Sequence, residues 1–144
     1  MGHRSNITVV GGGIIGCAVA YELARRGTAV SVVEGRDVGG GATQASAGML
    51  APFIEAQHLS HLWVLGARSL ELYDTFVADV ANDSGSPVPY ERTGTIQVAV
   101  DKASLERLER TEERLSSAGV ACRLLTRADA IIAEPHLGSN ACGA

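Results

Sequence analysis

The hydrophobic positions at the start of the chain change their spacing twice, which predicts a strand, a helix and a second strand. Residues 6–10 form a short run of mostly β-branched residues, as in a parallel strand buried on both faces. Residues 14–26 then repeat apolar side chains every three or four positions, typical of a helix, and Gly27 is a natural C-terminal cap. Residues 29–33 are apolar again. This order predicts a βαβ unit and an α/β fold.

Three glycines with the spacing G-x-G-x-x-G join the first strand to the helix. Gly11 allows a tight turn, Gly13 lets a diphosphate approach the backbone, and Gly16 lets the helix lie close to the strand. The helix N-terminus offers free N–H groups and partial positive charge to an anion. Glu34 ends the second strand, where this fingerprint places an acid that binds ribose hydroxyls. We therefore predict a dinucleotide site, because a βαβ turn without a ligand would not explain Glu34.

The remaining chain alternates helical and extended patterns. Apolar spacing predicts a long helix over 59–80, a half-buried antiparallel strand over 95–100, a charged helix over 101–117, a strand over 120–125 and a short helix from 126. A short extended piece is also expected at 90–92. The polar run 82–87 is the clearest boundary. We expect two parts, residues 1–84 and 85–144.

Composition narrows the function classes. The net charge is −4 and no Lys/Arg cluster occurs, which gives no support for a nucleic-acid surface. The three cysteines (Cys17, Cys122 and Cys142) form no C-x-x-C pair, which favours a reducing cytoplasm. His58 and His61 lack further ligands at a useful spacing, so we expect no metal site and interpret both as solvated helix-end side chains.

The segment after Glu34 points to a family. Residues 38–50 are small, glycine-rich and uncharged, and we interpret them as an extended loop along a large ligand; a flexible linker is the alternative. Together with the glycine loop, Glu34-Gly35 and the run Ala47-Gly48-Met49-Leu50, they resemble the FAD-binding start of the D-amino-acid-oxidase-like family of FAD-dependent amine oxidoreductases. Within it, the likeness is to the glycine oxidase group of thiamine biosynthesis. The resemblance covers residues 7–52 and continues more weakly to the end.

The resemblance implies a Rossmann-like FAD-binding βαβ core, incomplete here, followed by the start of an α+β substrate domain. It implies FAD as cofactor and a small amine or amino acid as substrate, oxidised to its imine by hydride transfer to the flavin. It also implies a set of cofactor-binding residues: Gly11, Gly13, Ile14, Ile15, Gly16, Glu34, Gly35, Ala42, Thr43, Ala47, Gly48 and Met49.

No catalytic residue is assigned, because the family binds the substrate carboxylate through a distal segment. Members of the family are much longer, so we expect an N-terminal fragment that is inactive alone and exposes apolar surface and unpaired sheet edges. A homo-oligomer is possible. Two alternatives remain at this point: an NAD(P)-dependent Rossmann dehydrogenase, and a non-catalytic, truncated FAD-binding module.

Overall fold

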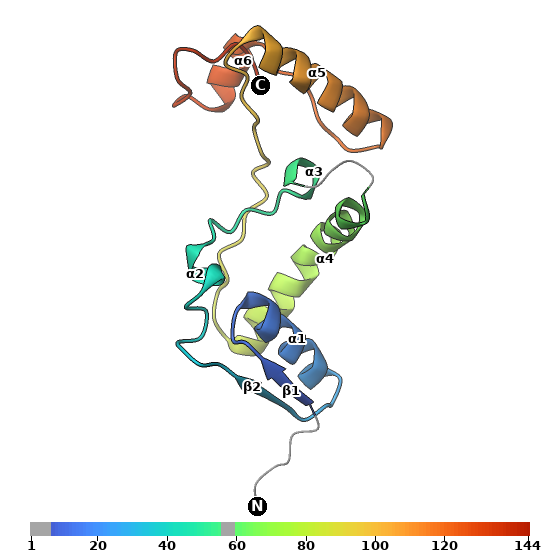
Figure 1. Ribbon diagram of the computed structural model, residues 1–144, viewed down its shortest axis with the longest axis vertical. Helices are drawn as coiled ribbons and strands as arrows, with labels where there is room; N and C mark the ends of the chain where they lie inside the picture. The colour runs from blue at the N-terminus through green and yellow to red at the C-terminus, as the bar shows by residue number, and fades with distance from the viewer. Residues whose placement is uncertain (1–6, 56–59) are drawn as a thin grey trace, which may run out of the picture. The chain divides into compact units, whose positions relative to one another are not determined.

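A computed structural model describes residues 7–55 and 60–144 of the chain (Figure 1). The chain divides into two compact units, one up to Met49 and the other from Leu50 onward. The predicted division into residues 1–84 and 85–144 stays a prediction. Leu59 and His58, which the sequence places at the start of the long helix, lie outside the described residues.

The first unit contains the predicted βαβ arrangement. Strand β1 spans Ile7–Val10, helix α1 spans Ile14–Arg25 and strand β2 spans Val30–Val33. The two strands are parallel, with Ile7 opposite Val30 and Val10 opposite Val33, and α1 packs against both strands. The α/β expectation and the boundaries of these elements are confirmed to within a residue or two.

A short helix, α2 (Ala42–Ala45), interrupts the segment 38–50, which was predicted to be an extended loop. Gly39 has a positive φ of 77°, and the amide of Gly40 donates to the carbonyl of Asp37 at 2.9 Å. The amide of Gln44 then donates to the carbonyl of Gly39 at 3.0 Å. The extended-loop prediction is therefore wrong over α2, because local turn bonds curl the backbone there.

The second unit is mainly helical. It contains α3 (Pro52–Glu55), α4 (His61–Ser84), α5 (Lys102–Ser117) and α6 (Arg127–Ala133). Three side-chain caps explain the starts of α4, α5 and α6: Ser60 accepts from the amide of Trp63, Asp101 from that of Ser104, and Thr126 from that of Asp129. The three helices predicted in this part of the chain are confirmed, but α4 continues to Ser84 and so takes up the start of the polar run 82–87 that was predicted to be a turn.

The strands predicted over 90–92, 95–100 and 120–125 are wrong. Between described residues, the pairing in and next to these segments is limited to isolated antiparallel bridges, from Gly143 to Ala99 and to Thr126. Ala99 is fully buried, whereas the alternating Ile96 and Val98 that were expected to face inward are 41% and 38% exposed. A strand needs a partner along its length. Among the described residues, the segment 95–100 is bridged at Ala99 alone.

Arg92 anchors the extended segment after α4 onto that helix. Its Nη2 donates to the carbonyl of Leu70 at 2.9 Å, and its Nε donates to the Tyr90 hydroxyl at 3.0 Å. Nε also lies 3.1 Å from Oδ1 of Asp74. The Tyr90 ring lies 5.7 Å from that of Tyr73 on α4, centroid to centroid. This cluster replaces strand pairing as the means of holding the segment.

Apolar side chains remain on the surface of both units. In the first unit Val10 is 84% exposed and Val33 is 53% exposed, at the carboxyl ends of β1 and β2. In the second, Trp63 packs edge-on against Phe53 at 5.3 Å but Leu65 is 67% exposed. The expectation of exposed apolar surface is confirmed. Within the described residues, no helix has the length and hydropathy needed to cross a bilayer.

Candidate dinucleotide site

The bend between β1 and α1 has the geometry that the glycine spacing predicts. Gly11 adopts a φ of +104°, and its amide donates to the carbonyl of Val33 on β2 at 2.8 Å. A Cβ on Gly16 would lie 2.0 Å from the carbonyl oxygen of Gly11 and 3.4 Å from Cγ1 of Val9. Only glycine therefore allows α1 to start this close to the strand.

Glu34 extends from the end of β2 to the bend. Its Oε2 accepts a hydrogen bond from the amide of Gly12 at 2.8 Å, and its Oε1 accepts one from the amide of Arg36 at 2.9 Å. The Gly12 bond, followed by the Arg36 bond, lowers the pKa of the Glu34 carboxyl below its ordinary value of 4.5. The group is therefore ionised at neutral pH, and each oxygen retains a further lone pair that can accept a ribose hydroxyl.

Thr43 approaches the bend from α2. Its Oγ1 accepts a hydrogen bond from the amide of Ile14, the first residue of α1, at 3.0 Å. A Cβ on Gly13 would lie 3.1 Å from the same oxygen. The amide of Gly39 donates to the carbonyl of Gly12 at 2.9 Å, so the loop before α2 also follows the bend. The structure thus brings Thr43 and the glycine bend together.

The other predicted residues lie on the first turn of α1, in the stretch 47–49, or next to Glu34 and Thr43 in sequence. Ile14 and Ile15, on the first turn of α1, are 55% and 79% exposed, which leaves apolar side chains open beside the bend. Met49 is 71% exposed, and Gly48 has a positive φ of 72°. In the part of the chain that the structure describes, no hydrogen bond joins the stretch 47–49 to the bend. Gly35 and Ala42 adjoin Glu34 and Thr43 in sequence, and Ala47 adjoins Gly48.

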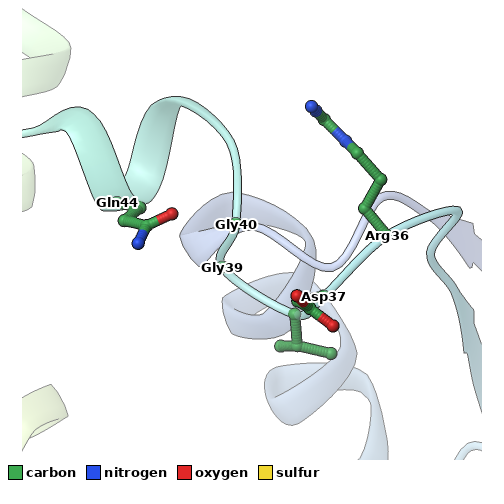
Figure 2. A pocket seen from close by; sticks show the side chains of 6 residues that line it. Arg36, Asp37, Gly39, Gly40 and Gln44 are labelled. Carbon is green, nitrogen blue, oxygen red and sulfur yellow. The ribbon is translucent and has the colours of Figure 1, made fainter.

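A pocket next to this site includes residues that sequence reasoning did not assign. It has a volume of about 450 Å³, and its lining residues are Arg36, Asp37, Val38, Gly39, Gly40 and Gln44. Figure 2 shows Arg36 and Gln44 on opposite sides of the Gly39-Gly40 backbone. The sequence signal for this pocket was the pair Gly39-Gly40 between the polar residues Arg36 and Gln44. The turn into α2 is what brings those two side chains to one pocket.

The bend suits the diphosphate and ribose of a dinucleotide. Among residues 7–55 and 60–144, the amides of Gly13, Ile15 and Gly16 have no hydrogen-bond acceptor. They lie at the N-terminus of α1, where the helix dipole favours an anion. Beside them, Glu34 offers the acceptors that a ribose diol requires. Anion donors and a sugar acceptor thus lie within one small unit.

Comparison with known proteins identifies the family. The sequence profile of the DAO family, described as FAD dependent oxidoreductase, matches residues 6–144. The chain belongs to this family. Its membership decides between the two cofactor alternatives in favour of FAD, because the family and its glycine oxidase members are FAD-dependent.

Three relatives illustrate the similarity. Glycine oxidase from Geobacillus kaustophilus is 31% identical over 98% of the chain, and its crystal structure matches with a TM-score of 0.92 over 99% of the chain. L-proline dehydrogenase from P. horikoshii is 27% identical over 99% of the chain, and iminodiacetate oxidase from Chelativorans sp. BNC1 is 28% identical over 96%. Both match with a TM-score of 0.76. The chain covers 37% of the length of the G. kaustophilus glycine oxidase sequence, 38% of its crystal structure, and 36% and 38% of the other two structures.

Proposed function

We propose that this chain forms the diphosphate- and ribose-binding part of an FAD-dependent oxidoreductase that oxidises a small amino acid or related amine. The names of the three relatives support this substrate class, since glycine, L-proline and iminodiacetate are all amines that carry a carboxylate. When bound, FAD supplies the hydride acceptor of such an oxidation. The residues of this chain bind and orient it.

The observation that carries the proposal is the contact between Glu34 and the bend. An acid at the end of the second strand is common to many βαβ units, but here its carboxylate lies 2.8 Å from an amide of the glycine bend itself. Ribose and diphosphate are adjacent in FAD, so their protein partners must also be adjacent. We assign the amides of Gly13 and Ile15 to the diphosphate and the Glu34 carboxylate to the adenosine ribose.

The remaining cofactor contacts follow from the family resemblance. We propose that Gly35, Ala42 and Thr43 contact the nucleotide half of FAD, and that Ala47, Gly48 and Met49 follow the flavin. The positive φ of Gly48 and the 71% exposure of Met49 support this assignment. We assign no catalytic residue within these 144 residues.

Binding and turnover can be tested separately with the purified 144-residue chain. We expect it to retain FAD on gel filtration, with flavin absorbance in the protein peak, and to bind FAD in preference to NADH. We expect no hydrogen peroxide from glycine, sarcosine, D-alanine or L-proline, because the matched relatives are much longer than this chain. Failure to bind FAD would contradict the assigned site, and turnover would contradict the expected inactivity.

A further inference from the structure

We propose that Thr43 and Glu34 are positioning residues that hold the glycine bend in its binding geometry before the cofactor arrives. The inference rests on the proposed function, because it assigns the bend to FAD. It goes further by giving Thr43 a role toward the protein backbone in addition to any contact with the ligand. The observation that carries it is that Glu34 and Thr43, from two different segments, accept hydrogen bonds from alternate amides of the same bend.

The two contacts are independent in sequence and similar in geometry. Glu34, at the end of β2, accepts a hydrogen bond from the amide of Gly12 at 2.8 Å. Thr43, on α2, accepts a hydrogen bond from the amide of Ile14 at 3.0 Å. Gly13 lies between these two amides, and a Cβ there would lie 3.1 Å from the Thr43 hydroxyl oxygen. The bend is therefore held on both sides of Gly13.

This arrangement divides the bend amides between protein and ligand. The amides of Gly12 and Ile14 are bonded to side chains, whereas those of Gly13 and Ile15 have no acceptor in the described chain. Both side chains can make further hydrogen bonds. The Thr43 hydroxyl still has its own hydrogen to donate, and the Glu34 oxygen that accepts from Gly12 has a second lone pair. A diphosphate can therefore bind without displacing either contact.

The physical benefit is a smaller ordering cost on binding. The sequence Gly11-Gly12-Gly13 has no side chains, so its backbone is free to occupy many conformations. A site that is ordered only when the ligand binds loses affinity by the cost of ordering it. Two side chains that fix alternate amides remove part of that cost in the free protein.

Thr43→Val tests the inference, because it keeps the side-chain shape and removes the acceptor. Thr43→Ser keeps the hydroxyl and serves as the rescue variant. Thr8→Val is the matched control, since Thr8 lies on β1 in the same unit and its side chain has no hydrogen bond among the described residues. Amide exchange of Gly13 and Ile14 by NMR in the free chain and fluorescence titration with FAD give two readouts that do not require activity.

We expect faster exchange at Ile14 and a roughly two- to tenfold weaker FAD affinity in Thr43→Val, as expected for one lost hydrogen bond. Thr43→Ser and Thr8→Val should behave like the unchanged chain. Unchanged exchange at Ile14 would overturn the inference, as would equal or tighter FAD binding, since tighter binding would mean that Thr43 competes with the ligand. If the unchanged chain binds no FAD, the proposed function fails, while the exchange at Ile14 still decides whether Thr43 holds the bend.

Discussion

The Glu34 carboxylate and the Gly12 amide lie 2.8 Å apart, although 22 positions separate them in sequence. The contact joins the end of β2 to the bend after β1, and it is possible because the two strands are parallel neighbours with Val10 opposite Val33. The carboxyl ends of both strands therefore reach the same edge of the sheet. The acid of the fingerprint thus has a structural partner as well as a proposed ligand.

Replacing Glu34 with Gln is expected to weaken FAD binding by about tenfold or more. A glutamine oxygen is uncharged, and its NH2 group would face a backbone N–H where a carboxylate oxygen now accepts one. FAD titration by flavin fluorescence measures the effect. Glu22→Gln is the control, because in the described part of the chain Glu22 pairs with Arg25 and Arg26 on α1 at exposed positions. Equal affinity in the two variants would argue against Glu34 as the ribose acceptor.

The same contact should respond to acid. The pKa of Glu34 is lower in the folded chain than its ordinary value of 4.5, first because of the Gly12 amide and then because of the Arg36 amide. Its contribution to stability is therefore fully present above about pH 4.5 and is lost as the pH falls through the lowered pKa. We expect the NMR shift of the Gly12 amide to titrate with a midpoint below 4.5. A higher midpoint, or the same titration in Glu34→Gln, would contradict this assignment.

Gly16→Ala is expected to lower the free energy of unfolding by roughly 1–3 kcal/mol, even though alanine is the better helix former. The added Cβ would lie 2.0 Å from the Gly11 carbonyl oxygen, so the bend or α1 must move. Gly35→Ala is the matched control, because a Cβ there meets nothing within 4 Å. Urea denaturation of both variants gives the comparison. A Gly16→Ala chain as stable as Gly35→Ala would show that α1 can move away from the strand without cost.

In the second unit, Arg92→Ala should lower the melting temperature more than Arg68→Ala does, because it removes more contacts. The substitution removes the bonds to the Leu70 carbonyl and the Tyr90 hydroxyl and the ion pair with Asp74. The side chains of the ion pair are 51% and 57% exposed, which limits its contribution. Arg68→Ala removes the exposed pair with Glu71 within α4 and is expected to have less effect. Thermal unfolding followed by circular dichroism distinguishes the two variants.

Much of the first unit was predictable because its signals are local. The run 7–10, the glycine spacing and the acid at 34 required only the periods of strand and helix and the sterics of a tight turn. The structure shows Glu34 at the bend, as those signals indicate. The contact of Thr43 with Ile14 was not predictable from spacing, because it depends on α2 turning back toward the bend.

The sequence by itself determined the βαβ order, the main helices of the second unit and the glycine bend, because helix periodicity, caps such as Ser60 and Asp101, and backbone sterics act between near neighbours. Tertiary structure alone decided that the apolar alternation over 95–100 forms no strand, with Ala99 buried in place of Ile96 and Val98. It also decided which bend amides are already bonded. A strand and a long-range hydrogen bond both need a partner from a distant segment, and only the folded chain supplies its position.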